Sequence, residues 1–270
     1  MAFSVSKIKK SVERIRNLGF IDDVQPDVLS PFDPDLANIT FEVFEGKPGM
    51  LSAGAGFSSL DGLIGTLSLQ HLNLFGRAYR TSVAWSFGAR VNDFSVGWAT
   101  PWIKDRPISL GLDLFNTRRV SAFEGSSRGF THKKTGAALN LGPRFLDDKY
   151  RLDFRYTFQK ITVADVQDQF VGSLSQGTSI SSVLGVEAAR DTRDNIWDPG
   201  SGTRNSIGMN LSGGPLQGNI HFWKPFVSNS AHKTLFSIAD YPLVLSVSNR
   251  ASYVTPFFET KEVPVFERMF

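Results

Sequence analysis

The sequence lacks cysteine altogether and contains no long apolar run. Without cysteine the chain forms no disulfides and no thiolate metal sites. A transmembrane helix needs about 20 consecutive apolar residues, and no segment approaches that length. An excess of charge is also missing, because the formal net charge is only +3, which indicates no nucleic-acid partner. The absence of a membrane helix is what a chain that crosses a membrane with β-strands predicts.

Phenylalanine and glycine are abundant, with 23 and 24 copies, and from Gly49 onward apolar and polar residues alternate. Successive side chains of a strand point to opposite faces, so alternation produces one apolar and one polar face. The segment Arg151–Phe158 shows this most clearly. One face would carry Leu152, Phe154, Tyr156 and Phe158, and the other Arg151, Asp153, Arg155 and Thr157.

About eleven such strands are predicted, and many of their polar positions hold glycine, alanine or serine. The pattern favours an antiparallel transmembrane β-barrel with lipid on the apolar face and a polar interior. The alternative is a soluble β-sandwich binding module, in which a second sheet would cover the apolar rows. Several aromatic residues near strand ends are candidates for interfacial girdles, namely Trp85, Trp98, Trp102, Trp223, Tyr253 and Phe257.

The links between the predicted strands differ in length. Outer-membrane barrels have short periplasmic turns and long outer loops. If the first strand begins at a periplasmic N-terminal domain, the long links Val120–Lys134 and Ala164–Thr178 lie on the outer side of the membrane. The shorter links Pro101–Pro107 and Pro143–Tyr150 then lie inside, and the long inner link Asp191–Arg204 breaks the trend.

The N-terminal part has a different pattern. Residues Ser4–Leu18 are predicted to be helical, and strands are predicted at Ile21–Val28 and Ile39–Phe44, connected through Pro31 and Pro34. The apolar stripe of the helix consists of Ile8, Val12, Ile15 and Leu18. This α+β layer is too small for a whole domain. Because Met1–Lys10 has no signal-peptide core and an outer-membrane barrel must be exported, we expect a fragment.

Several segments resemble the BamA family of outer-membrane assembly factors and its bacterial surface antigen relatives. Leu18–Val24 resembles the helix-to-strand corner of the last POTRA domain, and Glu45–Gly49 its passage into the barrel. His71–Arg77 is similar to the family turn N-L-F-G-R-G, although Ala78 stands where the family usually has glycine. Ala99–Pro107 resembles the next turn of this type, and Asp191–Arg204, the most specific match, the turn after the eighth strand.

The resemblance implies a division of the chain. Residues 1–48 would form the end of the last POTRA domain in the periplasm. Residues 49–270 would form about eleven of sixteen strands of a barrel in the bacterial outer membrane. The end of the chain, Val263–Phe270, resembles the approach to the sixth outer loop.

The same resemblance implies a function, which is the assembly and insertion of β-barrel proteins without ATP. The implied partners are unfolded outer-membrane protein precursors, accessory lipoproteins of the assembly complex and the lipid bilayer. The alternative within the family is a translocation-and-assembly paralogue or a two-partner secretion pore that exports a polypeptide through its lumen.

No residues point to an enzyme, a cofactor or a metal. The spacing of Asp191, Asp194 and Asp198 does not match a calcium loop, so we predict a turn anchored by Arg193 and Arg204. The turn residues singled out by the family motifs are Asn73, Phe75, Gly76, Arg77, Asp191, Arg193, Asp194, Asp198, Gly202 and Arg204.

The functional candidate is the first barrel strand. In the family this strand meets the last one at a seam that parts sideways, and an incoming chain can add its own strand to the exposed edge. The candidate edge consists of Leu51, Ser52, Ala53, Gly54, Ala55, Gly56 and Phe57. Gly54 and Gly56 either weaken this strand so that it opens or ease the curvature of a barrel wall.

Overall fold

The computed structural model describes residues 4–29, 38–59, 61–104, 106–123, 126–146, 148–168, 176–196, 198–238, 241–258 and 260. The expected connection through Pro31 and Pro34 and the segment Val263–Phe270 lie outside these residues, as does Asp105 of the Ala99–Pro107 turn. Within them, no helix has both the length and the apolar character needed to cross a membrane.

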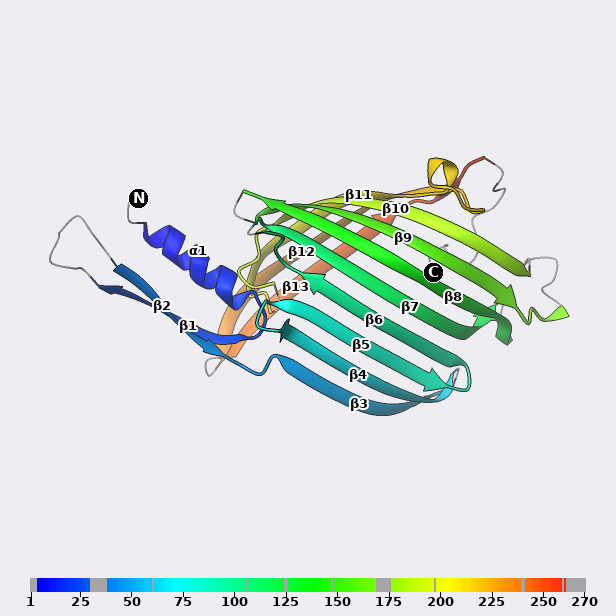
Figure 1. Cartoon of the computed structure of the whole chain (residues 1–270), viewed down its shortest axis with the longest axis horizontal. Helices are drawn as coiled ribbons and strands as arrows, with labels where there is room; N and C mark the ends of the chain where they lie inside the picture. Colours follow the sequence, from blue (N-terminus) through cyan, green and yellow to red (C-terminus); the bar gives the residue numbers. More distant parts are fainter. Residues whose placement is uncertain are drawn as a thin grey trace.

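The N-terminal unit consists of one helix beside a two-stranded antiparallel ribbon (Figure 1). Helix α1 spans Val5–Arg16, β1 spans Ile21–Leu29 and β2 spans Asn38–Glu45, close to the predicted bounds. The predicted apolar stripe of the helix is half-buried, and Phe20 and Val24 are buried beside it. Gly19 follows the helix at φ +85°, the left-handed conformation that glycine adopts readily.

The rest of the described chain forms one large antiparallel sheet in which each strand pairs with the next in sequence. Its central path contains eleven strands from β3 to β13, the number predicted, and the short β14 pairs with β12. The strands are β3 Gly49–Ser58, β4 Gly62–Leu74, β5 Tyr79–Gly88, β6 Val91–Thr100, β7 Ile108–Phe123, β8 Ser126–Phe145, β9 Tyr150–Ala164, β10 Gly177–Asp191, β11 Ser201–Ser212, β12 Phe222–Ile238, β13 Tyr241–Ser252 and β14 Thr255–Pro256.

Cross-strand register places the alternating apolar residues on a common face. Leu112, Leu139, Tyr156, Leu184 and Leu211 stand directly opposite one another on five successive strands. We call this side the apolar face and the other side the polar face. Large side chains exposed on the apolar face include Leu67, Leu69, Trp85, Phe87, Phe94, Leu114, Leu141, Phe158, Ile207 and Met209.

No second sheet covers the apolar face in the described part of the chain, since all strands from β3 to β14 belong to one sheet. Leu152 and Phe154 are only half-buried, and Tyr156 and Phe158 are 38% and 48% exposed. The sandwich alternative requires these side chains to be sealed, so the architecture argues against it.

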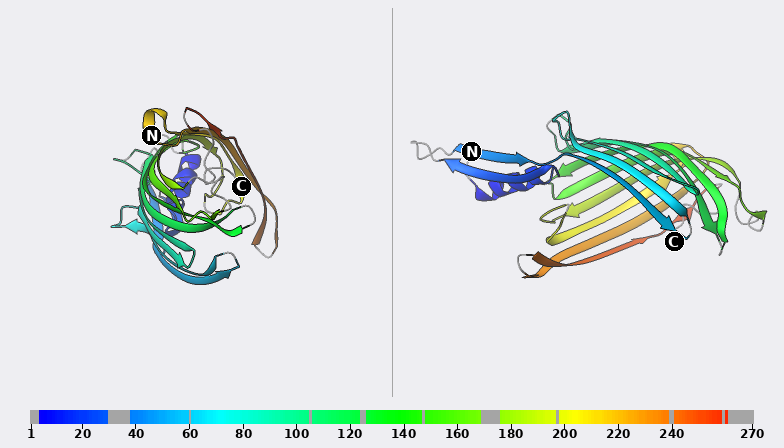
Figure 2. Two further views of the ribbon diagram at one scale, coloured as in Figure 1. Left: turned by 90° about the vertical axis from the view of Figure 1, so that its right-hand side faces the viewer. Right: turned by 90° about the horizontal axis from the view of Figure 1, so that it is seen from below.

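The sheet curls into a trough, as the end view in Figure 2 shows. Its two edge strands, β3 and β13, do not pair with each other in the described residues, so the sheet is open. Inside the trough lies a small cluster of Ile161, Ile220 and Phe222, against which Val183 and Val254 pack. The expected part of a barrel, about eleven of sixteen strands, is therefore present as an open, curved antiparallel wall.

One expectation about the links between strands was wrong. The segment Val120–Lys134 is not a long loop, because β7 continues to Phe123 and β8 begins at Ser126, with Val120 opposite Thr131. Strands that extend into water carry charged residues, here Lys133 and Lys134, without losing their pairing.

Other links agree with the prediction. Strand β6 ends at Thr100 and β7 begins at Ile108, while β9 ends at Ala164 and β10 begins at Gly177. The inner ends of the strands lie beside the N-terminal unit, and the β3–β4 turn lies at the opposite end (Figure 1). A 3-10 turn at Gly214–Leu216, which the sequence did not predict, lies in the β11–β12 link.

Candidate strand edge and family turns

Strand β3 has a partner on one side only. It pairs with β4 from Gly49 opposite His71 to Ser58 opposite Gly62, and its other side is a sheet edge. Leu51 and Phe57 are 70% and 79% exposed. An edge of this kind presents a row of unpaired N–H and C=O groups that another strand can bind.

The two glycines of this strand differ in their surroundings. A Cβ on Gly54 would lie 3.1 Å from Oγ1 of Thr66, whereas a Cβ on Gly56 would meet nothing within 4 Å. The Thr66 hydroxyl donates a hydrogen bond to the carbonyl of Gly54 at 3.4 Å. Gly54 therefore allows a close contact with β4, and Gly56 has no steric need to be glycine.

The β4–β5 turn contains Asn73, Phe75, Gly76 and Arg77. The Oδ1 atom of Asn73 accepts a hydrogen bond from the amide of Ala78 at 2.8 Å. Phe75 and Gly76 have φ of +57° and +66°, and Phe75 is 83% exposed. Arg77 is an exposed residue of the turn.

Ala78 is also left-handed, with φ of +54°. This conformation costs an L-residue roughly 1–2 kcal/mol, and glycine avoids the cost. The departure from the family motif therefore falls at a position where the backbone itself favours glycine.

The β10–β11 turn is held by short-range hydrogen bonds. The guanidinium of Arg193 donates to both carboxylate oxygens of Asp191, at 2.9 Å from Nε to Oδ1 and 2.6 Å from Nη2 to Oδ2. The amide of Thr192 donates to the carbonyl of Thr203 at 2.9 Å, which joins the two sides of the turn.

Asp194 closes the middle of this turn. Its carboxylate accepts hydrogen bonds from the amides of Asn195 and Gly200, at 2.8 and 3.1 Å, and from the Ser201 hydroxyl at 3.1 Å. Partial burial acts to raise the pKa of Asp194, but these hydrogen bonds outweigh it and hold the pKa below its ordinary value. The amide of Asp198 donates to Oδ1 of Asn195 at 3.3 Å.

The other two residues of this motif have separate places. Gly202 adopts φ of +108°, and a Cβ there would lie 2.4 Å from the carbonyl oxygen of Thr192. Arg204 lies on β11, where its guanidinium pairs with the carboxylate of Glu187 on β10 at 2.9 Å. The described residues contain no group of three His, Asp or Glu side chains suited to a metal ion.

Sequence reasoning missed the ionic contacts on the polar face. Nδ2 of Asn140 donates to Asp113 at 2.9 Å, and the guanidinium of Arg155 lies 3.5 Å from the same carboxylate. Arg119 pairs with Asp93 on the same face. These partners lie 26 to 42 residues apart in sequence, so only the strand register brings them together.

The fold defines a class of protein, a curved antiparallel sheet with an exposed apolar face and a polar, ion-paired face. This is the construction of an outer-membrane barrel wall. Residues 73–270 match the Omp85 superfamily domain. The match covers more than half of the chain, which therefore belongs to the Omp85 superfamily.

Individual relatives agree with this assignment. The chain is 27% identical over 272 residues to the outer membrane protein assembly factor BamA of Nitratidesulfovibrio vulgaris, covering 99% of this chain and 33% of that protein. It is 22% identical over 295 residues to BamA of Neisseria meningitidis, covering 99% of this chain and 35% of that protein. The chain thus spans about a third of the length of these curated relatives.

Among solved structures, BamA of Haemophilus ducreyi lacking POTRA domains 1–3 has a TM-score of 0.64 at 18% identity, covering 98% of this chain and 52% of that one. CdiB of Acinetobacter baumannii has a TM-score of 0.54 at 11% identity, covering 90% and 46%. At these identities the likeness shows a shared fold.

Proposed function

We propose that this chain is part of an outer-membrane assembly factor that inserts β-barrel proteins into the bacterial outer membrane without ATP. The relatives that match almost the whole chain carry the name of such a factor. The uncovered apolar face supports placement in a bilayer, because each bare Leu or Phe would otherwise face water.

In this proposal residues 1–48 are the end of the last POTRA domain and lie in the periplasm. Residues 49–270 are the first part of the barrel, with the β3–β4 turn on the outer side. The close join supports this division, because β2 ends at Glu45 and β3 begins at Gly49. Accessory lipoproteins would belong to the complex that the whole protein forms.

The mechanism is strand addition at β3. An incoming unfolded precursor would pair its backbone with residues 51–57, satisfying main-chain groups that lipid cannot. The observation that carries this step is the combination of a free edge with exposed side chains at Leu51 and Phe57. No side-chain chemistry is required of the strand.

Disulfide trapping in the full-length protein tests the mechanism, because this region has no cysteine of its own. Single cysteines would be placed at Ser52 or Ala55 of β3, and cysteines would be moved one at a time along the strands of an unfolded barrel precursor. The matched control is Ala137→Cys on β8, which is paired with β7 and β9.

Trapping at Ser52→Cys and Ala55→Cys with a fixed register, and not at Ala137→Cys, would support strand addition. Equal trapping at all three positions, or trapping only by cysteines placed on the polar face of strands other than β3, would contradict it. The latter result would favour the alternative of a pore that passes its polypeptide through the lumen.

A further inference from the structure

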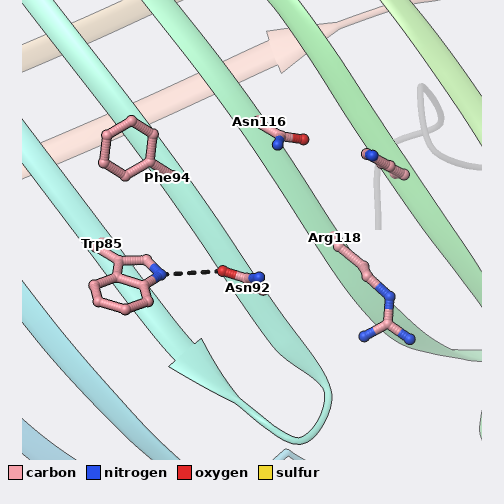
Figure 3. Close-up of a pocket in the computed structure, with 6 residues that line it drawn as sticks. Trp85, Asn92, Phe94, Asn116 and Arg118 are labelled. Carbon is pink, nitrogen blue, oxygen red and sulfur yellow. Dashed lines mark hydrogen bonds between the residues drawn. The ribbon is translucent and has the colours of Figure 1, made fainter.

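The apolar face carries a hollow near the outer ends of β5 to β8, with a volume of about 480 Å³. Its lining residues are Trp85, Asn92, Phe94, Asn116, Arg118 and Lys133. In Figure 3 the Trp85 indole points toward Asn92, and its Nε1–H donates to Oδ1 of Asn92 at 3.1 Å. The hollow therefore combines an aromatic side with a basic side.

The basic side of the hollow places two positive charges opposite each other on neighbouring strands. Arg118 on β7 and Lys133 on β8 stand directly opposite each other, and both are exposed. Like charges placed opposite each other across two strands are destabilising. Among the residues that the structure describes, no carboxylate forms an ion pair with either side chain.

The neighbouring positions on the polar face behave differently. Arg119, next in sequence to Arg118, forms an ion pair with Asp93. A third cation, Lys160 on β9, lies on the same side as Lys133, since it is opposite Thr135. In the described part of the chain, three cations that form no ion pair thus lie on the side that bears the apolar rows.

The level of these cations within the sheet indicates what would neutralise them. Toward the inner ends of the same strands the apolar face continues with Leu114 and Leu112 on β7 and Leu139 on β8, each 42% to 49% exposed. Such rows fit acyl chains, and the cations then lie where lipid headgroups begin. Arg is suited to binding phosphate through two parallel hydrogen bonds.

We propose that Arg118 and Lys133 bind the phosphate of an anionic lipid whose acyl chains lie along the Leu114 and Leu139 rows. Trp85 and Phe94 flank the headgroup, as aromatic residues do at membrane interfaces. This site is separate from the β3 edge and holds whether or not that edge accepts precursor strands.

Lipid binding to the full-length protein in detergent, measured by native mass spectrometry, tests this proposal. The probes are dioleoylphosphatidylglycerol and dioleoylphosphatidylcholine, which differ in net headgroup charge. We expect a preference for the anionic lipid that falls roughly five-fold for each cation removed in the R118Q and K133Q variants. The charge-preserving variant K133R should retain it.

The matched control is K134Q, which removes the same charge from the same strand but on the polar face. Equal loss of the preference in K134Q and K133Q would overturn the proposal, as would unchanged binding in the R118Q/K133Q double variant. The proposal would also be overturned if inorganic phosphate competed as effectively as the lipid, since contacts between the acyl chains and the leucine rows would then contribute nothing. Unaltered unfolding of K133Q in urea establishes that a lost preference is not a folding defect.

Discussion

Replacing Gly202 with alanine tests how far the β10–β11 turn depends on one backbone conformation. Gly202 has φ of +108°, and an added Cβ would lie 2.4 Å from the Thr192 carbonyl oxygen and 2.7 Å from Cα of Arg193. Both neighbours are backbone atoms, so no side-chain rotation relieves the overlap. The turn must open for alanine to fit.

The expected cost follows from two effects. The left-handed conformation costs an L-residue about 1–2 kcal/mol. Opening the turn weakens the pairing between Thr192 and Thr203, which includes the 2.9 Å backbone hydrogen bond and the 3.2 Å bond from the Thr203 amide to the Thr192 hydroxyl. At about 1 kcal/mol for each of these bonds, G202A should lose about 3–4 kcal/mol of unfolding free energy.

Urea unfolding of the full-length protein in micelles measures this loss, and G56A is the control. A Cβ at Gly56 meets nothing within 4 Å, so alanine there should leave stability unchanged or raise it by about 0.5–1 kcal/mol. If G202A unfolds within about 0.5 kcal/mol of the natural protein, the turn does not need this conformation. If G202A and G56A are equally destabilised, backbone geometry is not the cause.

Two further substitutions test the fold. A78G should stabilise the protein by about 0.5–1 kcal/mol in the same urea experiment. Glycine relieves the backbone strain at φ of +54°, and the greater freedom of the unfolded chain offsets part of this gain. A loss of stability would contradict this account of the β4–β5 turn. Y156K should cost about 2–4 kcal/mol for folding into bilayers, because it places a charge on the apolar face near mid-strand. Its neighbour T157K points to the polar face and should cost far less, and equal costs would remove the distinction between the faces.

Alternation predicted the strands well because burial follows a period of two. In β9 it assigned Leu152, Phe154, Tyr156 and Phe158 to one face, and the register with β8 and β10 places them there. Helix α1 was equally clear because its apolar stripe has helical spacing. The prediction of a long link at Val120–Lys134 was wrong, because the strands continue past the apolar rows.

The candidate site was less predictable than the fold. Family motifs singled out Asp191, Arg193 and Asp194, but their contacts depend on the path of the turn, and Arg204 contacts Glu187 on the neighbouring strand instead. The pairing of Arg118 with Lys133 was not predictable, because a one-residue change in register would move one cation to the other face. Sequence alternation fixes which residues share a face within one strand, but not which stand opposite them.

The two glycines of β3 differ in their contribution to the strand. Gly54 approaches Thr66 closely, so its small size serves the packing of β3 on β4. A Cβ added at Gly56 would meet no atom within 4 Å, and Gly56 does not adopt a positive φ, so neither space nor backbone conformation requires glycine there. A glycine in a strand that could hold alanine gives up about 0.5–1 kcal/mol. In a strand with a single partner that loss weakens the pairing with β4, whereas under the proposed mechanism a client strand would add to the opposite, unpaired side of β3.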